Sequence, residues 1–150
     1  MATYFLDTSA LVKRYVAETG SAWICELTDP TKGNEIVVAK LCGPEAISAF
    51  VRKSPPVPNL SVVLADFRFD FRKQYHRAAL TNAVIATAMQ LAESHRLRGY
   101  DAVQLATAVE LHKARDAASL PPLTFVSADD ALNAAALRES LVVDDPNAHP

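Results

Sequence analysis

The sequence has few of the residues that build common cofactor and metal motifs. It contains four glycines and two cysteines in 150 residues. The glycines are dispersed, which excludes a phosphate-binding loop and a Gly-rich dinucleotide motif, because both need clustered glycines. The cysteines, Cys25 and Cys42, lack the spacing of a zinc site and are too few for a disulfide framework. We expect both to be small apolar residues, buried or half-buried, in a reducing compartment.

Long apolar runs are also missing. The longest apolar region, 83–92, is interrupted by Thr87 and Gln90, and no run approaches the ~20 residues that a membrane helix needs. Near the N-terminus, Asp7 stands where a signal peptide would continue its apolar segment, so we expect no signal peptide. The sequence thus predicts a cytoplasmic protein that does not associate with a membrane.

Neither sign of charge is in excess. The chain has 15 Lys and Arg against 17 Asp and Glu, for a net charge of −2. This balance gives no bulk signal for nucleic acid, although it can conceal a local basic patch. The length fits one domain. We expect a single domain over 1–143 and a polar, loose C-terminal tail over 144–150.

Short apolar runs alternate with helical patterns along the chain. This alternation predicts a parallel sheet covered by helices on both faces. The segment 61–74 fits both periodicities, since FRFDFR alternates while Val63, Phe67 and Phe71 recur every four residues; its length favours a helix. The expected strands are 3–6, 35–39, 76–80, 123–126 and 141–143, and the expected helices are 10–16, 22–27, 44–53, 61–74, 82–95, 101–114 and 127–137.

Four acidic residues lie where helices are expected to begin: Asp7, Glu45, Asp101 and Asp129. In a parallel sheet the carboxyl ends of the strands share one edge, so these acids should converge there. Each acid taken alone is better explained as a helix cap, or as a first-turn charge that complements the helix dipole, than as a catalytic residue. The pattern from Asp101 to Gln104, for example, is typical of a capping box.

The helical faces favour an inward position for two of these acids. Asp101 shares a stripe with Leu105, and Asp129 shares one with Leu132, so both should point toward packed surfaces. Asp130 lies on a different stripe, which favours Asp129 but leaves the fourth position open between the two.

Four carboxylates in one cleft would raise each other's pKa unless a cation neutralised them. A ligand set of oxygen atoms, with no His or Cys in the pattern, favours Mg²⁺ or Mn²⁺ over Zn²⁺. Such sites commonly activate water for phosphate-ester chemistry. Two other acid-based folds do not fit. A haloacid-dehalogenase-type phosphatase needs Asp-x-Asp where this chain has Asp7-Thr8-Ser9, and a response-regulator receiver needs a late Lys that the last strands lack.

The motifs around the acids resemble the PIN-domain family, and specifically a VapC-like toxin ribonuclease of a type II toxin–antitoxin system. The resemblance covers nearly the whole chain. It is carried, in order, by FLDTSALVKRY (5–15), PEAISAFVRK (44–53), LRGYDAVQLATAVEL (97–111) and LTFVSADDAL (123–132). Gly43-Pro44 departs from the more regular run that the family has before the second acid.

The resemblance implies a three-layer α/β/α PIN-like domain with a central parallel sheet of about five strands. It implies a metal-dependent endoribonuclease in which Asp7, Glu45, Asp101 and Asp129 bind Mg²⁺ or Mn²⁺ and support cleavage of RNA by a metal-activated water. Ser9 and Ser127 match supporting polar positions. A homodimer and a VapB-like antitoxin that covers the active site are also implied.

RNA binding needs positive charge near the acidic cleft. The candidate substrate-binding residues are Lys13, Arg14 and Arg52, which lie near the expected acids in sequence. Glu45 also shares a face with Ser48, Ala49 and Arg52, small or polar residues that would leave room beside it. The candidate aromatic residues for stacking on bases are Tyr15, Trp23, Phe50 and Tyr100, although we expect them in the core or at an interface.

Two alternatives to a ribonuclease stay open. One is a non-catalytic PIN-like module that binds RNA or protein, which predicts RNA binding without metal-stimulated cleavage. The other is a DNA-directed or structure-specific nuclease on the same scaffold, which a comparison of RNA and DNA substrates in Mg²⁺ would separate from the first reading.

Overall fold

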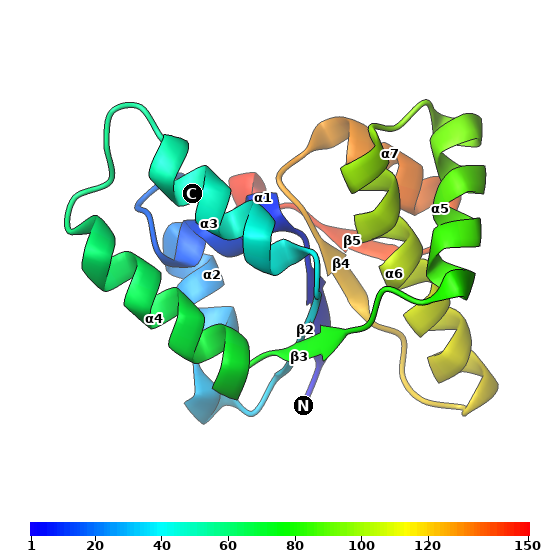
Figure 1. The fold of residues 1–150 in the computed structure, drawn as a ribbon. Helices are drawn as coiled ribbons and strands as arrows, with labels where there is room; N and C mark the ends of the chain where they lie inside the picture. Colours follow the sequence, from blue (N-terminus) through cyan, green and yellow to red (C-terminus); the bar gives the residue numbers. More distant parts are fainter.

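A five-stranded, all-parallel sheet forms the centre of the molecule (Figure 1). The computed structural model describes all residues, 1–150. The strand order is β3-β2-β1-β4-β5, so the two strands that precede Asp7 and Asp129, β1 and β4, are neighbours. The strands are β1 (Thr3–Leu6), β2 (Glu35–Ala39), β3 (His76–Ala78), β4 (Thr124–Val126) and β5 (Val142–Asp144).

Helices cover both faces of this sheet, which confirms the three-layer α/β/α architecture (Figure 1). One face carries α5 (Asn82–His95), α6 (Gly99–Ala117) and α7 (Asp130–Arg138). The other face carries α1 (Thr8–Leu11), the 3-10 turn η1 (Val12–Arg14), α2 (Ser21–Leu27), α3 (Cys42–Arg52) and α4 (Leu60–Lys73). A short 3-10 turn, η2 (Pro30–Lys32), precedes β2.

Alternate strand residues supply two separate cores. Phe5 and Val37 point to the side of α5, α6 and α7, whereas Leu6 and Val38 point to the side of α1 to α4. All four are 5% exposed or less. Because successive side chains of a strand alternate between faces, a sheet buried on both faces needs the continuous apolar runs that the sequence shows.

The ambiguous segment 61–74 is helical, as predicted, and forms α4. Phe67 is buried against Phe50 and Phe71, with ring centroids 5.6 and 5.5 Å away, whereas Phe69 lies on the exposed face. The expected helix 10–16 is instead the short α1 followed by η1, which changes helical type at Val12.

The C-terminal residues are packed rather than loose, so that prediction is wrong. Asp144 ends β5, and Pro146–Ala148 form a 3-10 turn, η3. The His149 ring stacks on Trp23 of α2 at a centroid distance of 4.1 Å, and its Nε2 lies 2.8 Å from Asp144 Oδ1. Gly20, with φ +86°, faces the Pro146 carbonyl so closely that a Cβ would collide with it.

No helix has both the length and the apolar character needed to cross a bilayer. The two cysteines are free thiols: Cys42 is buried in α3 and Cys25 is exposed on α2. The expectation that both would be at least half-buried is therefore wrong for Cys25, because its position on α2 faces away from the core.

Candidate active site

The four predicted acids lie around the carboxyl edge of the sheet. Asp7 directly follows β1, Asp129 lies three residues after the end of β4, and the two are the N-caps of α1 and α7. Glu45 and Asp101 lie in the first turns of α3 and α6. Burial raises the pKa of Asp101, and the nearby charges of Asp129 and Glu45 raise it further, while Arg98 lowers it. The charges of Asp129 and Glu45 therefore act on Asp101, and the charge of Asp101 acts on Asp7.

Asp7 is the most enclosed of the four, with 4% of its surface exposed. Its Oδ1 accepts hydrogen bonds from Ala10 N at 3.0 Å and from Ser9 Oγ at 2.7 Å, and its Oδ2 accepts one from Ser127 Oγ at 2.9 Å. Burial raises its pKa to about 6, although these hydrogen bonds act in the opposite direction. Asp7 thus caps α1 and is also held by the two serines that follow β1 and β4.

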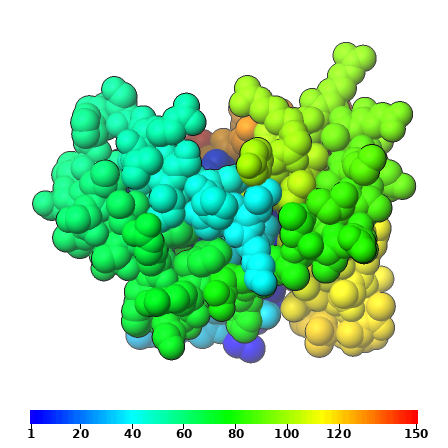
Figure 2. Space-filling model, viewed as in Figure 1, coloured from blue at the N-terminus to red at the C-terminus, as the bar shows by residue number.

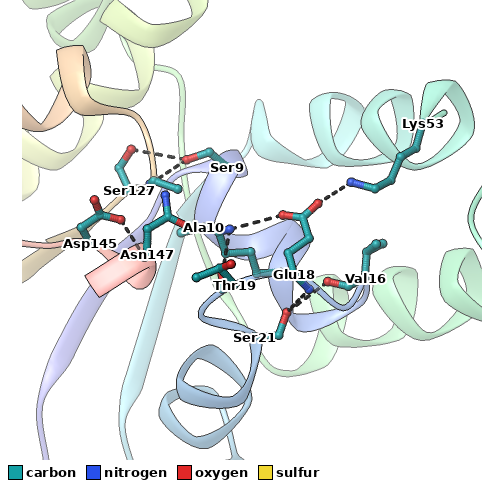
Figure 3. Close-up of polar contacts among 12 residues, drawn as sticks. Ser9, Ala10, Val16, Glu18, Thr19, Ser21, Lys53, Ser127, Asp145 and Asn147 are labelled. Atoms are coloured by element: carbon teal, nitrogen blue, oxygen red, sulfur yellow. Dashed lines mark hydrogen bonds and ion pairs between the residues drawn. The ribbon is translucent and has the colours of Figure 1, made fainter. Parts of the chain in front are cut away.

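Ser9 and Ser127 connect the two turns that follow β1 and β4. Ser9 Oγ accepts a hydrogen bond from Ala128 N at 2.9 Å, and Ser127 Oγ accepts one from Asp129 N at 3.1 Å. The two hydroxyls face each other at 3.4 Å (Figure 3). Because both also donate to Asp7, they fix its carboxylate relative to the backbone of Asp129.

Glu45 is held by two residues, Thr8 and Gln104, that the sequence did not indicate as part of the site. Thr8 donates to Glu45 Oε2, and Gln104 Nε2 donates to the same oxygen and to Thr8 Oγ1, each at 3.0 Å. Gln104 is 2% exposed, and its own Oε1 has no partner. The interpretation of Gln104 as the partner of Asp101 in a capping box is wrong, because α6 begins at Gly99 with Arg98 as its N-cap. The sequence signal for a role of Gln104 in the site was its position, one helical turn after Asp101.

The structure separates Asp129 from Asp130. Asp129 Oδ1 accepts a hydrogen bond from Leu132 N at 2.9 Å, and its charge raises the pKa of Asp101. Asp130 is the first residue of α7 and is exposed. Of this pair, Asp129 is therefore the acid that lies with the other three.

Two of the predicted substrate-binding cations are engaged within the protein. Lys13 is buried, and its Nζ lies 3.3 Å from Glu18 Oε2 and 2.9 Å from the Thr19 carbonyl. Figure 3 shows that Glu18 also pairs with Lys53 at the end of α3. These contacts count against a role for Lys13 in holding a phosphate.

Arg14 is similarly engaged, on the side of α2 and α4. Its Nη1 donates to Thr28 Oγ1 at 2.8 Å, and its Nε lies 3.4 Å from Asp70 Oδ2. Arg52 differs from Lys13 and Arg14, because it is exposed and forms no ion pair. It borders a groove beside Glu45, as the small residues on that face of α3 predicted.

The donor atoms suit one class of metal better than another. No three carboxylate, imidazole or thiol groups lie close enough together to enclose one ion. A zinc site needs three or four such protein ligands, so these residues do not fit Zn²⁺. Mg²⁺ keeps several of its waters and commonly binds through one or two carboxylates. The Asp101 carboxylate, half-buried among like charges and without a hydrogen bond, fits Mg²⁺ or Mn²⁺.

No protein-family model matches the sequence, and no curated protein does. Solved structures match along nearly the whole chain. A chain of a toxin–antitoxin complex from Klebsiella pneumoniae is 15% identical with a TM-score of 0.66, covering 95% of this chain and 97% of that one.

Two further structures are similar. VapBC2 from Rickettsia felis, bound to a DNA fragment from its promoter, is 12% identical with a TM-score of 0.61 and covers 95% of this chain and 98% of its own. The PAE2754 protein from Pyrobaculum aerophilum is 15% identical with a TM-score of 0.63. The match covers 98% of this chain and 91% of that one. The chain therefore has the three-layer α/β/α PIN-like fold that its motifs predicted.

Proposed function

We propose that this chain is a Mg²⁺- or Mn²⁺-dependent endoribonuclease that hydrolyses RNA phosphodiester bonds. The observation that carries the proposal is the Asp101 carboxylate, which no protein donor satisfies and whose pKa is raised by burial and by two neighbouring acids. A half-buried carboxylate among like charges is unfavourable unless a cation joins it. Oxygen donors of this kind select a hard divalent ion.

The residues of the site would have different roles. Asp101 and Asp129 would hold the metal, with Glu45 and Asp7 completing the acidic wall. When bound, such a metal would supply an activated water and would stabilise the charge that develops on the phosphate oxygens. Ser9 and Ser127 keep Asp7 oriented, and Gln104 and Thr8 keep Glu45 oriented, so the carboxylates do not need to reorganise when substrate arrives.

We further propose that the ribonuclease is the toxin of a toxin–antitoxin pair, and that its partners are a VapB-like antitoxin and a second copy of the chain. Two solved structures of the same fold are toxin–antitoxin complexes, which supports this assignment. An antitoxin that covered the acidic edge would block access to RNA, which gives inhibition a simple steric basis.

The test is cleavage of one labelled sequence, prepared as single-stranded RNA and as DNA, by purified protein in Mg²⁺ and in EDTA. We expect Mg²⁺-dependent cleavage of the RNA. Preferential cleavage of the DNA would favour a DNA-directed nuclease instead. RNA that is bound but never cut, in Mg²⁺ or Mn²⁺, would favour a non-catalytic binding module.

A further inference from the structure

We propose that the groove between α3 and the start of α6 binds one unpaired nucleotide of the RNA, with its base on Tyr100 and its phosphate on Arg52. This inference rests on the proposed function and adds the residues that hold the substrate. The groove has a volume of about 480 Å³ and is lined by Pro44, Glu45, Ser48, Ala49, Arg52 and Tyr100.

The groove exists because one face of α3 carries small side chains. Ser48 and Ala49 lie one turn beyond Glu45 and form the low part of the wall, between Glu45 and Arg52. In Figure 2, a hollow separates the cyan atoms of α3 from the yellow-green atoms at the start of α6. Its size is within the range of pockets that bind small organic molecules, roughly 300–1,000 Å³.

Tyr100 supplies an aromatic face beside the acids. Its side chain is 60% exposed, forms no hydrogen bond, and immediately precedes Asp101 in the chain. The other aromatic candidates are engaged elsewhere: Tyr15 and Phe50 pack edge to face at 5.7 Å, and Trp23 stacks on His149. A single exposed aromatic residue is ordinary on a protein surface. One that lines a groove with an acid and a free cation is suited to stacking a base.

Arg52 supplies the positive charge of the groove. It lies in the last turn of α3, seven residues after Glu45, which places the two about 10 Å apart along the helix axis. A phosphate on Arg52 would therefore stand away from the Glu45 carboxylate, while the adjoining sugar and base reach toward Tyr100. The guanidinium has no carboxylate partner in the protein, so its donors are available to phosphate oxygens.

The arrangement selects an unpaired nucleotide. A base can stack on a side chain only when it is released from its own helix, as in single strands and loops. The groove offers one aromatic ring and one cation, which match one nucleotide rather than a duplex.

The experiment measures the binding of a fluorescein-labelled single-stranded RNA by anisotropy, in Mg²⁺ and over a range of salt concentrations. The Asp7→Asn variant serves as the background so that the RNA stays uncut. Tyr100→Ala should weaken binding about tenfold, because one base loses its stacking partner, and Tyr100→Phe should restore binding. Arg52→Gln should also weaken binding and reduce the slope of log K against log salt by about 0.7, the value for one phosphate contact to a single strand.

Matched controls are Phe69→Ala and Arg138→Gln, which remove an exposed aromatic residue of α4 and an exposed cation at the far end of α7. Neither should change the affinity. Equal RNA affinity in the background, Tyr100→Ala and Arg52→Gln proteins would show that the groove does not bind the RNA. This result would leave the nuclease proposal intact. An unchanged salt slope in Arg52→Gln would overturn the contact between Arg52 and a phosphate. A background protein that binds no RNA would overturn both proposals.

Discussion

Asp7 lowers the stability of the metal-free protein at neutral pH. Burial raises its pKa from 3.8 to about 6, so between these values the folded state holds a proton that the unfolded state has released. The contribution of Asp7 to the free energy of unfolding is therefore highest at low pH. It falls by about 3 kcal/mol as the pH rises from about 4 to about 6, because only the folded state still holds this proton over that range.

Asp7→Asn should remove this loss, because the amide needs no proton to be neutral. In EDTA at pH 7, the variant should be more stable than the native protein in urea unfolding, and its stability should depend less on pH between 4 and 6. Asp130→Asn, which changes an exposed acid, should behave like the native protein. An Asp7→Asn protein that was less stable at pH 7 would show that the ionised carboxylate is stabilised by its hydrogen bonds.

Gln104 acts through Glu45, so we regard it as a positioning residue. Gln104→Leu keeps the buried volume and removes both hydrogen bonds of the amide, including the one to Glu45. Residues that orient the groups around a bound metal contribute about 10- to 100-fold in affinity. Calorimetric titration with Mg²⁺ should therefore show at least about tenfold weaker binding. Gln90→Leu, on the exposed face of α5, should leave the affinity unchanged, and equal affinity in both variants would exclude the positioning role.

At the scale of elements, the packed C-terminus depends on one backbone position. Gly20 has a positive φ and lies against Pro146, whereas Gly33 has a positive φ and open space where a Cβ would stand. Gly33→Ala should cost only backbone strain, about 1 kcal/mol. Gly20→Ala should cost clearly more and should release η3 from α2.

Thermal unfolding and proteolysis check this prediction. The melting temperature should fall further for Gly20→Ala than for Gly33→Ala, and only Gly20→Ala should expose the residues after Asp144 to carboxypeptidase. Equal melting temperatures of the two variants would mean that the residues after Asp144 can move away from Gly20 without loss of stability.

Over the whole molecule, local sequence patterns predicted the elements well. The apolar runs 3–6 and 35–39 predicted strands, and the four-residue spacing of 61–74 predicted a helix. The structure has β1, β2 and α4 at these positions. The position of the acids near the carboxyl edge of the sheet was also predictable, because it needs only parallel strands and helices that start near their carboxyl ends.

Contacts that depend on strand order were not predictable. Gln104 meets Glu45 across 59 residues and Ser9 meets Ala128 across 119, and no local pattern encodes either pair. The burial of Lys13 was missed because Glu18 pairs with it across five residues. The packing of the tail was missed because His149 contacts Trp23 through its ring face and Pro146 contacts Gly20 through its backbone.

The most direct test of the account is the cleavage rate of a labelled single-stranded RNA in Mg²⁺ by the native protein, Asp101→Asn and Asp130→Asn. Removing the unpartnered carboxylate should slow cleavage by at least about a hundredfold, since metal stabilisation of the transition state is worth several kcal/mol. The exposed Asp130 should be dispensable. Full activity in Asp101→Asn, with its fold verified by circular dichroism, would contradict the proposed site.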